Sequence, residues 1–362
     1  MGELDHSKVG RLAVPVAVST VILAVVLAVL ALPSAAWDEQ EPSAGANQRA
    51  EPSSSPAHAH PVPAPPGWQP PPLEGAPVQQ AHGLGALPSK PGKYPVGPPP
   101  GLKAQQVIPP SVDLSAGEPP VGDQGWQSSC VGWATSYYYK TYQEWGEHRW
   151  DLNSPFHQFS PSFVYNQING GVDNGAAIGD ALNLIYREGD APWAVFPYTY
   201  DYTLQPTPAQ IEAAAPYVAR GYGAFFQHDS WWSGFYNNDI TALKLWLAGG
   251  DTLVISIPVY SYFSCRGSWS CYSSWACTYI YDGPYSGESY VGWHALQVVG
   301  YDDTYGYFQV INSWGTDWGC IGCGYLSYDF VRNYASEAWW MLDQLGDPML
   351  DRFKLFLPMV TR

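Results

Sequence analysis

The segment DQGWQSSCVGWA, residues 123–134, decides how this chain of 362 residues is interpreted. Prolines and glycines lead up to it, which indicates a loop, whereas Ala134, Tyr138 and Tyr142 recur at helical spacing. The sequence therefore predicts that Cys130 opens a helix. At that position the backbone N–H groups and the helix dipole favour a thiolate, the nucleophilic form of cysteine.

Two later segments supply the partners that such a nucleophile needs. HALQVVGY, residues 294–301, is typical of a strand that begins with His294, and NSWGTDWG, residues 312–319, opens with Asn312. An imidazole can act as the base for a cysteine nucleophile, and an amide can accept the other ring N–H. The other histidines fall before residue 107 or in polar, loop-like contexts, so His294 is the candidate base.

Gln124 adds a fourth group, on the loop before Cys130. This short separation lets its side-chain amide lie beside the Cys130 backbone N–H, and two such donors form an oxyanion hole. Trp314 is expected to shield the bond between His294 and Asn312 from water, which strengthens a hydrogen bond. Together these residues predict that Cys130 is a catalytic nucleophile and not merely a buried cysteine.

These segments resemble the papain family of cysteine peptidases, particularly its bacterial members. Residues 123–134 match the family's Gln-Gly-x-x-x-Ser-Cys-x-x-x-Ala box, residues 294–301 its histidine strand, and residues 312–319 its asparagine box. The resemblance implies a nucleophile, a base, an orienting amide and an oxyanion donor. In that order these are Cys130, His294, Asn312 and Gln124.

The resemblance also implies residues that contact the substrate. Asn174-Gly175 matches the loop that pairs with the substrate backbone, although Ala176 stands where the family has a second glycine. Trp314 matches the family's packing residue beside the catalytic groups, and Trp293 is expected to crowd the site next to the base. Asn174, Gly175, Trp314 and Trp293 are therefore the candidate substrate-binding residues, and proteins or peptides are the implied substrates.

The order of the expected elements predicts an α+β chain with two subdomains. Ser160 with Pro161 is a helix-start signal, and Gly189 is a stop signal. Helices are expected at Ser160–Ile168, Ile178–Glu188 and Ile240–Leu247, and strands at Thr252–Val259, Leu296–Tyr301, Phe308–Ile311, Tyr325–Tyr328 and Ala338–Leu342. The papain resemblance implies a helical left subdomain, a β-barrel-like right subdomain and an active-site cleft between them.

Composition divides the chain into four parts. Residues 1–36 are expected to be a signal peptide or signal anchor, because Lys8 and Arg11 precede an apolar run that ends in small residues. Residues 37–107 are expected to be a disordered, proline-rich linker, and they do not match the family's helical inhibitory prosegment. The peptidase domain is expected at 108–345, with a tail at 346–362. The protein is therefore expected to be secreted, or extracytoplasmic and tethered if the N-terminal segment is uncleaved.

Five cysteines remain besides Cys130. An exported chain can form disulfides, so we expect bridges among these five, at least one of them beside the active site. A zinc site is the alternative, because two of them form a Cys-x-x-Cys pair. The five are Cys265, Cys271, Cys277, Cys320 and Cys323.

Composition and charge exclude some function classes. A net charge of −16 without a basic stripe argues against nucleic-acid binding and against membrane contact other than through an N-terminal anchor. We expect a monomeric endopeptidase that uses no cofactor and no metal ion. Two alternatives stay open, a papain-like module that binds peptides without turnover and an amine acyl-transferase. Asn312 argues against the transferase, since transglutaminase-type enzymes favour Asp as the orienting residue.

Overall fold

A computed structural model of the protein describes residues 82–102, 107–228, 235–263 and 280–343. All of them belong to one unit of the chain, Pro56–Arg362. The expected signal segment, most of the expected linker and the tail lie outside the described residues. Within the described part, no helix has the length and apolar character needed to cross a membrane.

The first helical stretch runs without a break from Cys130 to His148. It consists of α2 (Cys130–Gly132), a π-helical stretch (Trp133–Lys140) and α3 (Thr141–His148), and the residues at both junctions keep helical backbone angles. All eight residues of the π-helical stretch are buried, so this helix crosses the interior. The prediction that Cys130 opens a helix is confirmed.

Three further helices accompany it, α4 (Pro161–Ile168), α5 (Ile178–Glu188) and α6 (Pro208–Ala214). At the start of α4, the Ser160 Oγ accepts the Phe163 N–H at 3.1 Å and Pro161 takes the first helical position, as predicted. The predicted bounds of α5 are confirmed, with Gly189 as its C-cap. The sequence analysis missed α6, although Thr207 and Gln210 form a capping box at its start.

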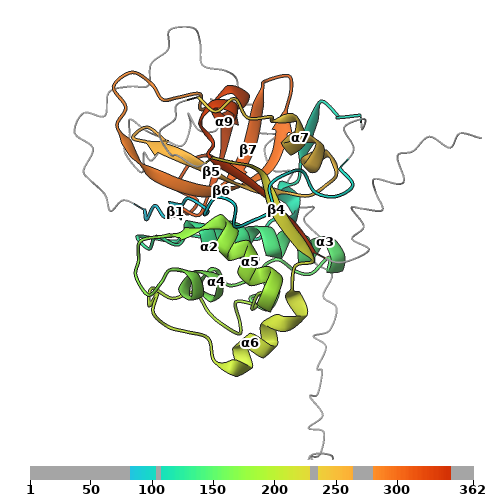
Figure 1. Cartoon of the computed structure of the whole chain (residues 1–362), viewed down its shortest axis with the longest axis vertical. Coiled ribbons are helices and arrows are strands. Elements are labelled where there is room, and N and C mark those ends of the chain that lie inside the picture. The colour runs from blue at the N-terminus through green and yellow to red at the C-terminus, as the bar shows by residue number, and fades with distance from the viewer. Residues whose placement is uncertain (1–81, 103–106, 229–234, 264–279, 344–362) are drawn as a thin grey trace, which may run out of the picture. The chain divides into compact units, whose positions relative to one another are not determined.

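A seven-stranded sheet forms the other half of the described chain, in the order β4-β9-β5-β6-β7-β8 with β2 paired to β6. Its strands are β2 (Ser111–Asp113), β4 (Gly221–Gln227), β5 (Leu253–Tyr260), β6 (Tyr290–Asp302), β7 (Tyr307–Ile311), β8 (Cys323–Ser327) and β9 (Glu337–Leu342). Helices α7 (Thr241–Ala248) and α9 (Tyr328–Tyr334) accompany it. Figure 1 shows the sheet above α2, α4, α5 and α6. The α+β class with a helical and a strand-rich part is confirmed.

Three details of the predicted strands are wrong. The sheet is open, not barrel-like, because its end strands β4 and β8 are not paired with each other in the described chain. His294 lies inside β6, which starts four residues earlier at Tyr290, and it pairs with Ile257 of β5, so the strand ladder holds its backbone in place. Tyr328 begins α9 and does not extend β8, because Ser327 caps that helix by accepting the Phe330 N–H.

Residues 82–102 fall within the expected linker, yet they pack on the domain. The short strand β1 (Ala86–Leu87) pairs in parallel with β3 (Ala176–Ala177), which precedes α5. Figure 1 shows β1 at the boundary between the helices and the sheet. For these residues the prediction of a linker is wrong. They contain few apolar side chains, but small residues and buried polar contacts hold them on the domain.

Two parts of this stretch differ in how they are held. We call residues 82–87 the covering segment and residues 89–97 the strap. In the strap, the Ser89 N–H and Oγ–H donate to the Glu337 carboxylate at 2.6 and 2.8 Å, and the Gly97 N–H donates to the Ala224 carbonyl at 2.7 Å. Tyr94 is buried in a core cluster that also contains Trp339. The strap is therefore part of the folded domain.

Candidate active site

Cys130 lies where the helical half meets the sheet. Its side chain is completely buried and belongs to a core cluster with Ala295 of β6 and Phe163 of α4. The thiol faces the backbone N–H groups of Ala295, Gly85, Val131 and Cys130 itself. A thiolate there would therefore receive several backbone hydrogen bonds.

His294 and Asn312 form the hydrogen bond that the sequence predicted for them. The His294 Nε2 lies 2.7 Å from the Asn312 Oδ1, and both side chains are completely buried. The Ser313 N–H also donates to the Asn312 Oδ1, at 2.7 Å. Because this oxygen only accepts, the Nε2 carries the proton and the Nδ1 of a neutral ring keeps its lone pair. The Nδ1 makes no hydrogen bond in the described part of the chain.

Trp314 covers this pair. Its ring centroid lies 4.4 Å from that of His294, and its side chain is almost fully buried. The Tyr138 hydroxyl, from the central helix, donates to the Asn312 carbonyl at 2.9 Å. The helix that begins at Cys130 is therefore tied to Asn312, which in turn holds His294. Burial of the bond between Asn312 and His294 keeps water away from it.

Gln124 is fixed by the segment that follows Asn312. Its backbone N–H donates to the Ser313 carbonyl at 2.8 Å, and its Oε1 accepts from the Ser313 Oγ at 2.6 Å. Its Nε2 is thereby turned the other way and donates to the carbonyls of Gly83 and Gln127, at 2.9 and 2.7 Å. The amide that the sequence assigned to an oxyanion hole thus points at a backbone carbonyl of the same chain.

The covering segment lies directly over these groups. The Gly83 carbonyl accepts a hydrogen bond from the Gln124 Nε2. The Gly85 N–H faces the Cys130 thiol, and the Gly85 carbonyl accepts the Ala176 N–H at 2.8 Å. Each of these contacts uses the backbone of the segment. The chain therefore presents a peptide backbone to its own candidate catalytic groups.

The fit of this backbone leaves no room for side chains at two positions. A Cβ on Gly83 would lie 2.1 Å from the Gln127 carbonyl oxygen, and one on Gly85 would lie 2.0 Å from the Ser128 carbonyl oxygen. Gly175 has a φ of +97° and its Cβ would lie 2.3 Å from the Gly85 carbonyl oxygen, so this contact is glycine to glycine. Close approach of backbone to backbone requires glycine here.

His82 begins the described part of the covering segment. Its Nε2 lies 3.0 Å from the Asp123 Oδ1, and its ring is stacked on Trp314 with the centroids 5.3 Å apart. The side chain is only 4% exposed. The sequence analysis set this histidine aside as part of a linker, and nothing in its immediate neighbours signals the stacking.

Burial sets the protonation of both catalytic candidates in this state. Loss of water raises the pKa of the Cys130 thiol to about 11, against the opposing pull of the surrounding N–H groups. Loss of water also lowers the pKa of His294 to about 3, which the bond to Asn312 only partly offsets. At neutral pH the covered site therefore holds a neutral thiol and a neutral imidazole. The expectation of a thiolate at the helix start does not hold here, because desolvation outweighs the backbone N–H groups.

The candidate substrate-binding residues lie around the same segment. Gly175 contacts Gly85, and Asn174 beside it is exposed. Trp293 is buried in the core cluster that contains Cys130, and Trp314 stacks with His82. The loop that was expected to pair with a substrate backbone is thus paired with the chain's own residues.

Gly83, Gly85 and Ser313 are the residues at the site that the sequence analysis missed. The signal available for the first two was the run His-Gly-Leu-Gly-Ala at 82–86, where two glycines alternate within a proline-rich stretch. Such a run is also common in linkers, so the sequence alone does not distinguish a linker from a segment that packs on the site. Ser313 carried no signal beyond its place in the asparagine box.

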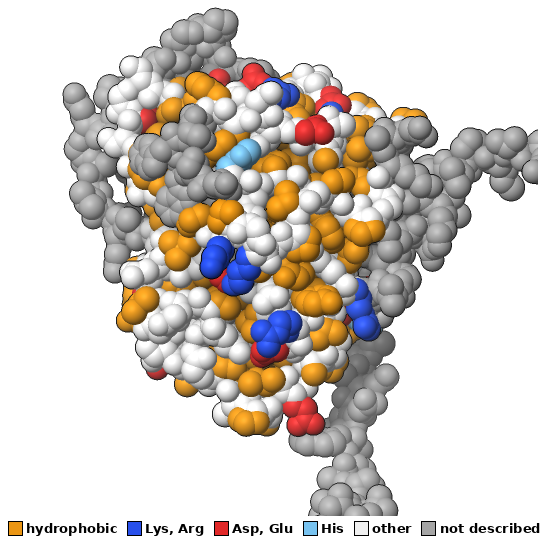
Figure 2. Space-filling view, viewed as in Figure 1, with side chains coloured by type: hydrophobic (Ala, Val, Ile, Leu, Met, Phe, Trp, Pro, Cys, Tyr) orange, Lys and Arg blue, Asp and Glu red, His pale blue; other side chains and the backbone are white. Residues whose placement is uncertain are grey.

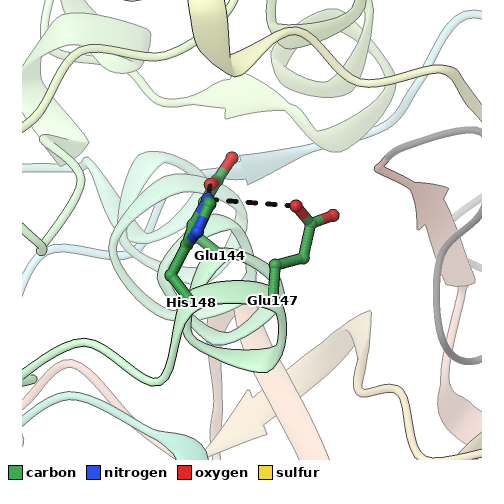
Figure 3. A group of neighbouring side chains, drawn as sticks. All are labelled: Glu144, Glu147 and His148. Atoms are coloured by element: carbon green, nitrogen blue, oxygen red, sulfur yellow. Dashed lines mark ion pairs between the residues drawn. The ribbon is translucent and has the colours of Figure 1, made fainter.

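A second group of polar side chains lies on α3, away from the candidate catalytic residues. Glu144, Glu147 and His148 bring their ligand atoms within 4.8 Å of one another (Figure 3). The buried Glu144 carboxylate is paired with Lys140 at 2.7 Å, and Lys140 also contacts Asp343 at 2.7 Å. We interpret the group as an ion-pair cluster because a buried lysine already satisfies its central carboxylate.

The cysteines divide into bonded and free. Cys320 is disulfide-bonded, whereas Cys130 and Cys323 are free. The two members of the Cys-x-x-Cys pair are therefore not bonded to each other. Cys265, Cys271 and Cys277 lie outside the described residues.

Basic side chains on the surface are mostly paired with acids. Lys244 contacts Asp303, and Lys93 contacts Asp180. On the face drawn in Figure 2, the basic side chains are few and lie scattered among apolar and acidic ones. This face has no continuous basic stripe of the kind that binds nucleic acid.

Comparison with solved structures decides what this arrangement resembles. Xylellain, a cysteine protease from Xylella fastidiosa, is similar over 75% of this chain and 100% of its own, with a TM-score of 0.58 and 24% sequence identity. The described chain has the papain-like fold. Procathepsin B S9 from Trypanosoma congolense is similar over 73% of this chain and 87% of its own, with a TM-score of 0.53 and 16% identity. The papain-like α+β fold implied by the sequence is therefore confirmed.

Sequence comparison points the same way. An uncharacterized peptidase C1-like protein of Acanthamoeba polyphaga mimivirus is 26% identical over 239 residues, which are 64% of this chain and 72% of that protein. No family model matches the chain. The resemblance to papain-like cysteine peptidases is confirmed, and these comparisons support a cysteine-type hydrolase.

Proposed function

We propose that the protein is a papain-like cysteine endopeptidase that acts on proteins or peptides outside the cytoplasm. The observation that carries the proposal is the 2.7 Å bond between His294 Nε2 and Asn312 Oδ1. It leaves the His294 Nδ1 as the one ring nitrogen able to accept a proton from a thiol. The expected signal segment at residues 1–36 supports the extracytoplasmic location.

In the proposed reaction, His294 Nδ1 takes the proton of Cys130, and the thiolate attacks the carbonyl carbon of a peptide bond. The negative charge on the carbonyl oxygen is held by the Gln124 Nε2 and the Cys130 backbone N–H. His294 then gives its proton to the leaving amine, which departs and leaves a thioester on Cys130. Water, deprotonated by His294, attacks the thioester and releases the carboxylic acid and the free thiol.

Asn312 and Trp314 have supporting roles in this proposal. The amide oxygen fixes the imidazole in the tautomer that the reaction needs, and the indole shields that bond from water. Ala176 offers a backbone N–H to which a substrate strand can pair, as the covering segment does at present.

The test is hydrolysis of casein in reducing buffer by the wild type and by a Gly85→Ala variant, whose covering segment no longer fits. We expect hydrolysis that is lost in Cys130→Ala, together with covalent labelling of Cys130 by an epoxide reagent. Hydrolysis that survives the Cys130→Ala change would contradict the mechanism. Peptide binding without cleavage would identify a binding module, and amide products formed with an added amine would identify an acyl-transferase.

A further inference from the structure

We propose that Asp173 is a positioning residue that ties the loop for substrate pairing to the loop that leads into the nucleophile. We call residues 173–176 the pairing loop and residues 123–129 the nucleophile loop. The inference rests on the proposed function, because both loops belong to the same site. It goes further by naming one side chain that sets how the two loops lie against each other.

The Asp173 carboxylate joins three parts of the chain. Its Oδ1 accepts the Ser128 N–H at 2.9 Å, from the nucleophile loop, and the Tyr165 hydroxyl at 2.6 Å, from α4. The Ser128 Oγ also donates to the Asp173 carbonyl at 3.3 Å. Hydrogen bonds to a carboxylate are stronger than those between neutral groups. One carboxylate oxygen therefore holds both the pairing loop and the segment that leads into Cys130.

Tyr165 extends this contact to the backbone of the pairing loop. Its hydroxyl accepts the Gly175 N–H at 3.3 Å while it donates to Asp173. Its side chain is completely buried, and α4 packs closely on α2, since a Cβ on Gly132 would lie 2.5 Å from the Pro161 carbonyl oxygen. Burial and the Asp173 carboxylate raise the pKa of the Tyr165 hydroxyl, so it stays protonated and remains a donor.

The start of the nucleophile's helix depends on how the loop before it is held. Ser129, at the N-cap position of α2, makes no side-chain cap bond, and its Oγ lies 3.1 Å from the Tyr198 hydroxyl instead. Neither the nucleophile loop nor the pairing loop contains a cysteine, so no disulfide can join them. The bonds from Ser128 to Asp173 therefore hold the backbone two residues before Cys130.

This link gives Asp173 an expected effect on both substrate binding and chemistry. The Cys130 N–H is a proposed oxyanion donor, and the Ala176 N–H is the proposed partner of a substrate strand. A shift of either loop changes the distance between these two donors, so a substrate held by one is misplaced for the other. Small misplacements of this kind lower reaction rates steeply. A residue that only stabilised the fold would leave KM and kcat of the folded enzyme unchanged.

The experiment measures peptide hydrolysis by the full chain in the Gly85→Ala background, with active enzyme counted by titration of Cys130 with the epoxide reagent. We expect Asp173→Ala to raise KM about fivefold or more and to lower kcat about tenfold, because two hydrogen bonds and the alignment of the donors are lost. Asp173→Asn keeps an oxygen that accepts from both donors and should retain most of the activity. Asp151→Ala is the matched control and should equal the background, since that carboxylate also accepts two bonds, both from Asn153 of its own turn.

Three outcomes decide the role of the link. Unchanged KM and kcat per titrated site in Asp173→Ala overturn the proposal, even if this variant unfolds at a lower temperature. A loss in Asp173→Asn as large as in Asp173→Ala also overturns it, because the charge would then matter and not the link. If Asp173→Ala does not fold, Tyr165→Phe decides. This change removes the acceptor of the Gly175 N–H and one donor to Asp173, so a raised KM supports the proposal and an unchanged KM overturns it.

Hydrogen exchange in the otherwise wild-type chain separates this inference from the proposed function. We expect Asp173→Ala to speed amide exchange about fivefold or more in peptides that cover residues 123–130 and 173–177, and Asp151→Ala to speed it in neither. If the Gly85→Ala background hydrolyses no peptide, the proposed function is contradicted and exchange alone decides. Faster exchange in both loops then supports the link, whereas faster exchange in the pairing loop alone, or in neither, overturns it.

Discussion

The Gly83 carbonyl accepts a hydrogen bond of 2.9 Å from the Gln124 Nε2. That donor is the amide proposed to stabilise the oxyanion of a reacting substrate, so one residue of the chain occupies the position in which a substrate carbonyl would be held. The bond explains why a site with its base correctly oriented is nevertheless closed. It also makes the role of Gln124 measurable in both the closed and the open state.

Replacing Gln124 should lower the rate of the chemical step. In the Gly85→Ala background, Gln124→Ala is expected to lower kcat by about 100-fold or more, because one preorganised oxyanion donor is lost. Gln127→Ala is the matched control, since this neighbour donates its side-chain N–H to the Thr199 carbonyl at 3.1 Å and not to the site. Equal kcat values for the two variants would remove Gln124 from the mechanism.

Replacing Asn312 should weaken both activity and stability. The change to Ala leaves the buried His294 Nε2–H without its acceptor, which costs about 1–3 kcal/mol. We expect a lower kcat, measured by peptide hydrolysis in the Gly85→Ala background, and a lower midpoint of unfolding in urea. Asn183→Ala removes another side-chain acceptor, that of the Tyr222 hydroxyl, and should leave kcat unchanged.

The closed state should be most stable between about pH 6.5 and 9. In the covered site the pKa of His294 is lowered to about 3 by burial, so an open state, with a pKa near the ordinary 6.5, binds a proton first as the pH falls. Acid therefore favours opening. The pKa of Cys130 is raised to about 11 by burial, so an open thiol with a pKa near 9.0 loses its proton first as the pH rises, and alkali also favours opening.

The ratio of Cys130 labelling rates in Gly85→Ala and in the wild type, measured from pH 4 to 10, isolates this effect from the reactivity of the thiol. We expect the ratio to be largest between about pH 6.5 and 9. A ratio that does not change with pH contradicts the prediction.

Loss of the Glu337 carboxylate should release the strap. It accepts from Ser89 twice and from the Trp339 indole N–H at 2.8 Å, and it is almost fully buried. Glu337→Ala leaves these donors unsatisfied and should destabilise the fold by about 3 kcal/mol or more. Ser89→Ala removes one of these donors and also the acceptor of the Gly179 N–H, 3.0 Å away, and should cost about 1–3 kcal/mol. Equal urea midpoints for the two variants would show that the carboxylate does not anchor the strap.

Thiol counting tests the cysteine assignment. Cys320 is disulfide-bonded and Cys130 and Cys323 are free, so unfolded protein should show more reactive thiols after reduction than before it. Peptide mapping without reductant is expected to find Cys320 joined to another cysteine and Cys323 alkylated. An equal thiol count with and without reductant contradicts this assignment.

Much of the fold could be predicted from the sequence where local signals are strong. The Ser160-Pro161 cap, the Gly189 stop and the apolar run of β5 each identify an element, because each acts within a few residues. The open form of the sheet could not be predicted, since it depends on which distant strands pair. The full length of β6 was also missed, because its first residues are exposed and lack the apolar pattern of the buried part of the strand.

For the candidate site, the sequence by itself determined which chemical groups are present: a thiol at a helix start, an imidazole, an amide to orient it and a second amide beside the thiol. These depend on residue identity and on short spacings along the chain. Only the tertiary structure decided their state. Gly83 and Gly85 carry no side chain that could announce a contact, yet their backbone approaches the floor of the site closely enough to exclude water. Burial raises the pKa of Cys130 and lowers that of His294, so the protonation of these groups depends on residues that are distant from them in the sequence.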